Sequence, residues 1–417
     1  MARKKLTLGL FGFGCVGGGL YDVLHQTPNL NAEIKKICVK HRHKPRKCSS
    51  ELLVYNALEI IDDPEINVVV EMIDDADAAF ELVSAALRRG KAVVSANKKM
   101  IAEHFSELHD LQKQFQAPFL YEASCCASIP IIRNLEEYYD NDLLSSIQGI
   151  VNGSTNYILT KVAEERKSYH EALLDAQQLG YAESNPILDV GGFDAKYKLL
   201  LLVIHAFGLV LKPEQILNVG IDRLNDLDLS YAREKGYQIK LVAQARRTEE
   251  GAVAACVLPA LVDSNDPLFR VSDVYNGLKV TSAFSDQQFF VGKGAGAFPT
   301  ASAVLSDISA LSYDYRYEYR KLGQGVSLSA EDQIHINVYV RAQVDELPQI
   351  GQYFVDVIER YSNQLEGYLV GKVSLASLRI LINRYDRLSV LAFNSSPLEV
   401  VKENQFEESS LASVLEG

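Results

Sequence analysis

The stretch LTLGLFGFGCVGGGLYDVL near the amino terminus constrains the fold more than any other part of the chain. Its first six residues predict a buried strand, the glycines a tight turn, and the remainder a helix. Gly12, Gly14 and Gly17 form the pattern G-x-G-x-x-G directly after that strand. The first glycine permits the turn, the second lets a pyrophosphate approach the backbone, and the third allows close helix packing. We therefore expect a dinucleotide site in which the helix start, with Cys15 and Val16, faces the phosphates.

A glycine turn of this kind also occurs in α/β proteins that bind no nucleotide, so the segments that follow matter. NVVVEMI (67–73) predicts a second buried strand, AAFELVSAALRRG (78–90) a helix, and KAVVSAN (91–97) a further strand. This alternation predicts a doubly wound, parallel sheet of the Rossmann type within an α/β protein. The length of 417 residues allows two or three domains.

The predicted strand EIKKICV should carry the residues that read the ribose, and a cationic run follows it: Lys40, His41, Arg42, His43 and Lys44. A site selective for NAD usually has an acidic residue here, whereas cations suit a 2′-phosphate. Lys40 and Arg42 therefore favour NADP. A solvated basic loop is the alternative, and the site could accept NAD as well.

Composition excludes several classes of protein. The net charge of −12 argues against a nucleic-acid partner. The apolar run after the first five residues is short and broken by glycines, unlike a signal peptide, and no segment is suited to span a membrane. The six cysteines lack disulfide or metal-ligand spacings, so we expect reduced thiols and a cytoplasmic location.

A polar stretch, YAESNPILDVGGFDAKYK (181–198), leads into the apolar run LLLLVIHAFG. Gly191 and Gly192 allow a sharp turn into a helix, whose first turn would hold Asp194 and whose next turn would place Lys198 on the same face. Such a pair can move the proton that a hydroxyl loses when it is oxidised by hydride transfer. An ordinary salt bridge at a helix start is the alternative. Burial would lower the pKa of the lysine and carboxylates would raise it, and the sequence leaves both outcomes open.

Six blocks in order give a resemblance to the homoserine dehydrogenases over about residues 6–312. The blocks are GFGCVG, SANKKMIA, YEAS with IPII, NGSTNYILT, the polar stretch above, and GKGAGAFPTASAVLSDI. Members of this family interconvert L-homoserine and L-aspartate 4-semialdehyde with NAD or NADP. Another amino-acid or semialdehyde dehydrogenase, or a catalytically silent NADP-binding sensor, stays an alternative at this stage.

The resemblance also implies roles for individual residues. The proton would be moved by Lys198, which Asp194 would orient. The homoserine pocket would be lined by Gly153, Ser154, Tyr181, Glu183 and Asp189, with Glu183 and Asp189 holding the amino and hydroxyl groups. Lys98 would lie near nicotinamide and substrate, Ser95 beside the cofactor, and Gly296 where the chain returns to it.

A monovalent cation, Na⁺ or K⁺, is a further implication. In relatives it is held by a glutamate and backbone carbonyls, which correspond here to Glu122 with Cys125, Ala127 and Ile129. The chain departs from the family pattern in this loop, because Cys125-Cys126-Ala127-Ser128 stands where a valine and several glycines are usual. Glycine-specific dihedral angles would no longer be freely available there.

The same resemblance implies a domain organisation. Residues 1–135 and 295–322 would form the Rossmann domain, and 136–294 an inserted α+β domain for substrate binding and dimerisation. After a polar linker, QIHINVYVRAQVDELPQIGQYFVDVIERY predicts a strand followed by a helix, and residues 333–402 fit a small βαββαβ unit that resembles ACT domains.

Pro348-Gln349 replaces the usual Pro-Gly of ACT domains, so this unit could bind an effector or serve assembly alone. Residues 403–417 would be a loosely ordered tail. We expect a homodimer or homotetramer and no fused aspartate kinase.

Overall fold

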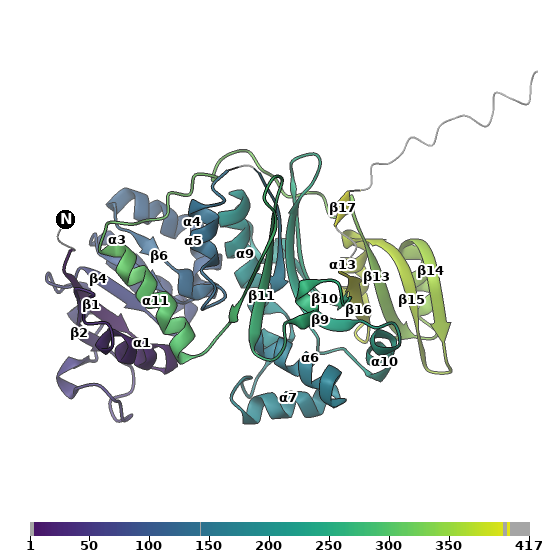
Figure 1. The fold of residues 1–417 in the computed structure, drawn as a ribbon, viewed down its shortest axis with the longest axis horizontal. Helices are drawn as coiled ribbons and strands as arrows, with labels where there is room; N and C mark the ends of the chain where they lie inside the picture. Colours follow the sequence, from purple (N-terminus) through teal and green to yellow (C-terminus); the bar gives the residue numbers. More distant parts are fainter. Residues whose placement is uncertain (1–3, 142, 395–397, 401–417) are drawn as a thin grey trace, which may run out of the picture.

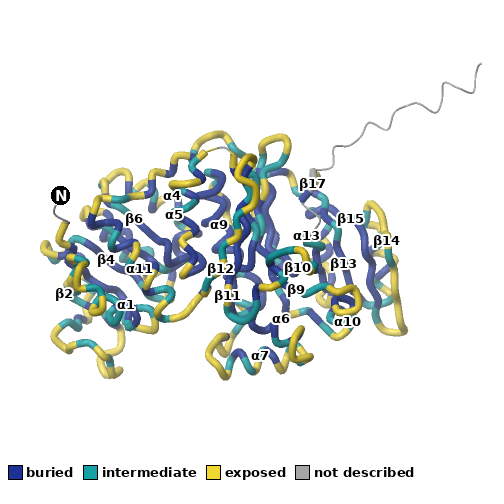
Figure 2. Tube along the Cα trace, viewed as in Figure 1, coloured by how far each residue is buried: buried dark blue, intermediate teal, exposed yellow. Residues whose placement is uncertain are grey.

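The computed structural model describes residues 4–141, 143–394 and 398–400, and the predicted tail of residues 403–417 lies outside them. Figure 1 shows an elongated molecule with the amino-terminal sheet at one end and the carboxy-terminal strands at the other. In Figure 2 the inner strands of both sheets are largely buried, and the exposed residues follow loops, outer helix faces and the edge strand β14. No helix among the described residues has both the length and the apolar character needed to cross a membrane.

The first sheet has six parallel strands in the order β3-β2-β1-β4-β5-β6. The strands are β1 (Leu6–Phe11), β2 (Ala32–Cys38), β3 (Leu53–Val54), β4 (Val68–Glu71), β5 (Ala92–Ser95) and β6 (Phe119–Leu120). The predicted parallel sheet is therefore confirmed. The strand order reverses between β1 and β4, and ligands of such sheets bind beyond the carboxyl ends of the strands at that reversal.

Helices from two distant parts of the sequence cover this sheet. They are α1 (Cys15–His25), α2 (Leu58–Ile61), α3 (Ala76–Arg88), α4 (Lys98–Phe115) and α11 (Ala297–Leu311). Helix α11 lies beside α1 in Figure 1. A Cβ added at Gly19 would lie 2.7 Å from the carbonyl oxygen of Ala297, so the two helices approach closely because Gly19 has no side chain. The Rossmann part is thus discontinuous, while its residue limits stay predictions.

The second sheet is mixed and has the order β12-β11-β7-β9-β10-β16-β13-β15-β14, with β8 and β17 pairing at β10 and β13. Its middle-region strands are β7 (Leu144–Ile150), β8 (Leu217–Asn218), β9 (Gln238–Arg247), β10 (Val253–Val262), β11 (Tyr275–Ser282) and β12 (Asp286–Lys293). The helices nearby are α5 (Ile131–Glu137), α6 (Gly153–Glu165), α7 (Tyr169–Gln178), α8 (Ile187–Val190), α9 (Phe193–Phe207) and α10 (Asp226–Glu234).

The carboxy-terminal unit has the predicted order of elements, β-α-β-β-α-β. These are β13 (Ile334–Gln343), α12 (Leu347–Ile350), β14 (Phe354–Ser362), β15 (Glu366–Ser374), α13 (Leu375–Arg384) and β16 (Ser389–Phe393), followed by β17 (Glu399–Val400). Strand β16 pairs in parallel with β10 through Ala260 and Ala392, so one sheet runs through both regions. The likeness to ACT domains stays a prediction.

The prediction of a helix after β13 is wrong over most of the predicted stretch. Helix α12 has only four residues, and Phe354–Ser362 forms strand β14. Its β-branched and aromatic residues suit a strand. Antiparallel pairing with β15 supplies the backbone partners that decide the conformation.

Candidate active site

The polar stretch leads into α9 as the sequence predicts. Gly192 precedes the helix with φ +77°, a left-handed conformation that glycine adopts without strain. Asp194 is 8% exposed and Lys198 is 7% exposed, at the start of an otherwise apolar, buried helix. The Lys198 Nζ atom lies 2.8 Å from Asp194 Oδ2, so the two residues share a helix face.

Three further groups converge on this pair from other elements. Lys98 at the start of α4 places its Nζ 2.9 Å from Asp194 Oδ1. Asn152, which follows β7 and caps α6, donates its side-chain amide to Asp194 Oδ2 at 2.8 Å and to Asp189 Oδ1 at 2.7 Å. The Val151 carbonyl oxygen accepts a hydrogen bond of 2.7 Å from Lys198. Asp194 is therefore enclosed by two ammonium groups and an amide.

The charges of this cluster act in opposite directions on its pKa values. Burial alone would lower the pKa of Lys198, but the Asp194 carboxylate outweighs it and raises the pKa above its usual value. Burial would raise the pKa of Asp194, but Lys198 and Lys98 hold it well below its usual range. Burial and the neighbouring Asp194 raise the pKa of Asp189. Near neutral pH, Lys198 is thus an ammonium and Asp194 a carboxylate.

Other predicted pocket residues lie around this cluster without joining it. Gly153 begins α6, and a Cβ there would lie 2.9 Å from the Val274 carbonyl oxygen. The Ser154 hydroxyl donates to the Tyr181 carbonyl oxygen at 2.5 Å, and Tyr181 is 43% exposed. Glu183 is also exposed, and within the described residues its carboxylate forms no ion pair. The structure does not bring Glu183 to Asp194.

The glycine turn opens onto a cleft of about 650 Å³ at the carboxyl ends of β1, β2 and β4. Gly12, Gly14, Cys15, Val16 and Lys40 line it, as does part of the loop after β2. A Cβ at Gly14 would meet no atom within 4 Å, whereas one at Gly17 would lie 2.7 Å from the Gly12 carbonyl oxygen. The second glycine therefore leaves room for a pyrophosphate and the third permits tight packing, as a dinucleotide requires.

Basic side chains are gathered at the end of this cleft that lies next to β2. His41, Lys44 and Arg46 line it together with Lys40. Arg42 stacks over the ring of Tyr55, another lining residue, with its guanidinium carbon 4.6 Å from the ring centroid.

Two other predicted cofactor residues lie apart from the cleft lining. The Ser95 hydroxyl is buried and donates to Glu71 Oε2 at 2.5 Å. Burial raises the pKa of Glu71 to about 7. Gly296 precedes α11 with φ +117°. The Ser95 side chain is therefore occupied by Glu71, and the cofactor roles of Ser95 and Gly296 stay predictions.

The loop with the two cysteines is buried and conformationally unusual. Cys126 (φ +54°) and Ala127 (φ +40°) adopt left-handed dihedral angles that favour glycine. For a residue with a side chain this conformation costs about 1–2 kcal/mol. Both Glu122 carboxylate oxygens accept backbone N–H groups, from Ile132 at 2.9 Å and Arg133 at 2.8 Å. Among the described residues, no three His, Cys, Asp or Glu side chains are grouped to hold a metal ion. Any cation here would depend on backbone carbonyls.

Sequence reasoning missed some members of these sites. Asn152 stands at the start of NGST, where an asparagine before a helix signals a cap but not a contact with Asp194. The Val151 carbonyl carries no side-chain signal at all. Lys196, two residues before Lys198, is also buried, with 8% of its surface exposed, and its Nζ lies 5.0 Å from the centre of the Phe193 ring.

Comparisons with known proteins identify the family. Residues 130–309 match the family model for homoserine dehydrogenase, and residues 12–122 match the model for its NAD-binding domain. The chain is 32% identical to the homoserine dehydrogenase of Bacillus subtilis over 96% of its own length and 97% of that protein. It is 37% identical to the enzyme of Helicobacter pylori, with 73% of each chain covered.

Solved structures give the same result. A crystal structure of a homoserine dehydrogenase from Thiobacillus denitrificans superposes with a TM-score of 0.83 at 27% identity, covering 94% of this chain and 98% of that one. A hyperthermophilic archaeal homoserine dehydrogenase in complex with NADPH has a TM-score of 0.65 at 27% identity, covering 75% and 99%. The chain belongs to the homoserine dehydrogenase family, NAD(P)-dependent oxidoreductases that interconvert L-homoserine and L-aspartate 4-semialdehyde.

Proposed function

We propose that Lys198 transfers the proton in this reaction and that Asp194 holds Lys198 in position. The bound nicotinamide cofactor supplies or accepts the hydride. In the direction of reduction, the Lys198 ammonium donates a proton to the carbonyl oxygen of the semialdehyde. In the direction of oxidation, the neutral amine accepts the proton of the homoserine hydroxyl. The raised pKa of Lys198 keeps it protonated near neutral pH, which is the form that the reduction requires.

The observation that carries this proposal is the pattern of hydrogen bonds at Lys198. An ammonium has three N–H donors. Two are taken by Asp194 Oδ2 and the Val151 carbonyl oxygen. The described residues thus leave one donor for a substrate oxygen, and the two acceptors fix its direction. A purely structural salt bridge would not require this spare donor.

We assign substrate binding to the groups next to this pair. Lys98 is more exposed than Lys198, so its ammonium can pair with the substrate carboxylate while it contacts Asp194. The Asp189 carboxylate can accept hydrogen bonds from the substrate amino group, and the Asn152 amide holds that carboxylate beside Asp194. Gly153 and Ser154 follow Asn152 at the start of α6. Tyr181 and Glu183 lie on an exposed stretch, which would have to fold over the substrate for them to contact it.

The pH dependence of the two directions tests the assignment of Lys198. Because the Lys198 pKa is raised above its usual value, the reduction rate should stay level from neutral into alkaline pH, and homoserine oxidation should gain as pH rises. The measurement is kcat for both reactions from neutral to alkaline pH, with saturating substrates. Profiles for both directions that do not change when Lys198 is replaced would contradict the proposal.

We propose that NADP is preferred over NAD. The cleft after β2 presents Lys40, Lys44 and Arg46, with Arg42 stacked beside it, and these cations suit a 2′-phosphate. Kd values of the wild-type protein for NADP⁺ and NAD⁺ at several salt concentrations are the first measurement. A preference for NADP that declines with salt is the expected result.

We further propose that Na⁺ or K⁺ binds beside Glu122. Burial raises the pKa of Glu122 to about 8, with the Asp307 carboxylate adding to the shift, and burial raises the pKa of Asp307 to about 7. Arg133 lies 3.0 Å from Asp307. Its single positive charge can balance only one of the two carboxylates, Glu122 and Asp307. A monovalent cation at the carbonyls of Cys125, Ala127 and Ile129 would balance the second carboxylate.

Assembly and location complete the proposal. A homodimer or homotetramer is supported by exposed apolar side chains on edge strands, such as Phe289 and Val291 on β12 and Ile358 on β14. The six cysteines are free thiols in the structure, which suits a reducing cytoplasm. The reaction belongs to the biosynthesis of threonine, methionine and isoleucine.

A further inference from the structure

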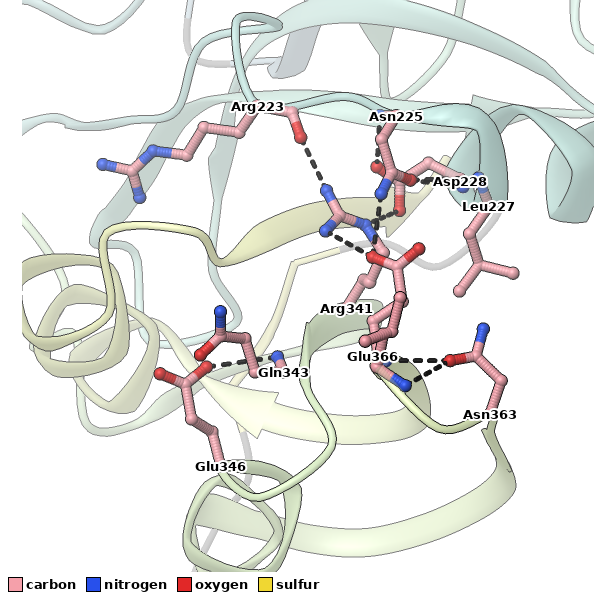
Figure 3. Close-up of polar contacts among 10 residues, drawn as sticks. Arg223, Asn225, Leu227, Asp228, Arg341, Gln343, Glu346, Asn363 and Glu366 are labelled. Atoms are coloured by element: carbon pink, nitrogen blue, oxygen red, sulfur yellow. Dashed lines mark hydrogen bonds and ion pairs between the residues drawn. The ribbon is translucent and has the colours of Figure 1, made fainter.

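The carboxy-terminal unit contacts the rest of the protein through a buried arginine. Arg341 on β13 lies beside polar groups of Arg223 and Asn225, which precede α10, of Asp228 in the first turn of α10, and of Glu366 at the start of β15 (Figure 3). Its Nε donates to Asp228 Oδ1 at 2.8 Å and its Nη1 to Glu366 Oε2 at 3.1 Å. Its Nη2 donates to the Arg223 carbonyl oxygen at 2.6 Å. The guanidinium thus holds one side chain and one backbone oxygen outside its own unit.

The same cluster also fixes the end of the segment it contacts. Asn225 donates its side-chain amide to Glu366 Oε2 at 2.8 Å. The Asn225 backbone N–H donates to Asp228 Oδ2 at 3.0 Å, which forms a capping box at the start of α10. Asp228 is fully buried. Residues 223–228 are therefore tied at three points to β13 and β15.

Residues 218–221, which precede this segment, support the turn that leads into α9. The Asn218 amide donates to the Gly191 carbonyl oxygen at 2.9 Å, and the Ile221 N–H donates to the Val190 carbonyl oxygen at 2.7 Å. A Cβ added at Gly220 would lie 2.2 Å from the Val190 carbonyl oxygen, so the two stretches are in direct backbone contact.

Asp189 and Asp194 flank the residues that are held in this way. We therefore propose that Arg341 is a positioning residue for the homoserine pocket: by holding residues 223–228 it fixes residues 218–221, which set the turn that carries Asp189 and Asp194. The proposal rests on the assignment of these two residues to the substrate pocket. Every step from Arg341 to the turn is either a hydrogen bond or a few residues of chain. The cofactor cleft belongs to the other sheet, so this support acts on homoserine and not on the dinucleotide.

The expected signature is a change in homoserine KM with unchanged cofactor binding. Arg341→Ala should raise homoserine KM by roughly fivefold or more, the lower end of usual coupling between separate sites. Arg341→Lys should lie between Arg341→Ala and the wild type, because a lysine can still pair with Asp228 but cannot donate to three acceptors in the same plane. NADPH Kd should stay within about twofold in each variant.

The matched control is Lys235→Ala. Lys235 also joins α10 to the carboxy-terminal unit, through an exposed ion pair of 3.1 Å with Glu359, but it does not hold residues 218–225. Its homoserine KM should equal that of the wild type. Should Arg341→Ala fail to fold, Glu366→Gln tests the same support, because it weakens the acceptor shared by Arg341 and Asn225.

The experiment measures homoserine KM, kcat and NADPH Kd for the full chain, with amide hydrogen exchange of residues 187–194 and 217–225. Higher KM together with faster exchange in both stretches supports the proposal. Folded Arg341 and Glu366 variants with wild-type KM and exchange would overturn it, as would an equal loss of NADPH affinity. The wild type and Lys198→Ala are assayed alongside, so an error in the proposed catalytic role is seen separately from an error here.

Discussion

Replacing Lys198 with alanine removes the group to which we assign proton transfer. The substitution deletes an ammonium that contacts Asp194 at 2.8 Å and the Val151 carbonyl oxygen at 2.7 Å. Loss of a positioned acid or base costs about two to four powers of ten in rate, or about 3–5 kcal/mol in the activation barrier. We expect kcat to fall by that factor in both directions.

The same change should leave the protein folded. Breaking a buried ion pair destabilises proteins by about 3–5 kcal/mol when the partner is left alone. Here Asp194 keeps Lys98 at 2.9 Å and the Asn152 amide at 2.8 Å, so the loss should not exceed about 3 kcal/mol. NADPH affinity should change little, because the glycine turn lies on the other sheet.

The assay follows NADPH absorbance with L-aspartate 4-semialdehyde near neutral pH, together with thermal unfolding and NADPH binding. Lys99→Ala is the control, because Lys99 is a half-exposed neighbour of Lys98 that pairs with Glu103 at 3.9 Å. Lys196 is unsuitable, since its burial adds a stability loss of its own. A folded Lys198→Ala protein that binds NADPH and turns over at near wild-type rate would refute the reasoning.

Four further outcomes are expected. The folded pKa of Asp194 lies below its unfolded value, so its stabilisation is present above about pH 4 and is lost as pH falls; urea unfolding of Asp194→Asn should show a weaker acid dependence than the wild type. Lys40→Ala combined with Arg42→Ala should weaken NADP binding more than NAD binding, and equal losses by titration would reject the 2′-phosphate assignment. Activity should differ between Na⁺, K⁺ and a bulky organic cation at constant ionic strength, and indifference would count against a required cation beside Glu122. Truncation after Ala330 should change oligomer mass or stability while threonine inhibits the full chain weakly or not at all; strong threonine inhibition that truncation abolishes would contradict an assembly role.

Patterns within short stretches account for what could be predicted. The G-x-G-x-x-G turn and the apolar strands near it indicate a parallel sheet, because neighbouring residues alone set the period of burial and the glycine conformations. The contact between Asp194 and Lys198 was predictable for the same reason, since residues four apart in a helix share a face. The boundary of α9 at Gly192 is likewise encoded locally.

Contacts between distant residues could not be obtained in this way. Asn152 and Lys98 meet Asp194 only because β7, α4 and α9 come together, and no short pattern encodes that meeting. The chain could have formed a helix or a strand at 354–362, and pairing with β15 determined the strand. Strand β14 also shows that a segment whose residues suit both helix and strand adopts the conformation in which its backbone can hydrogen-bond to a neighbouring element.

The sequence by itself determined the dinucleotide turn, the parallel sheet, the start of α9 and the residue types available for proton transfer, because each depends on side chains close together along the chain. Only the tertiary structure decided that Lys198 has a raised pKa and that Lys196, two residues away, has a lowered one. Both lysines are buried, and burial alone lowers the pKa of each. Asp194 reverses the effect for Lys198, because it lies within 2.8 Å, and the pKa depends on the distance in space between charges and on the water they lose.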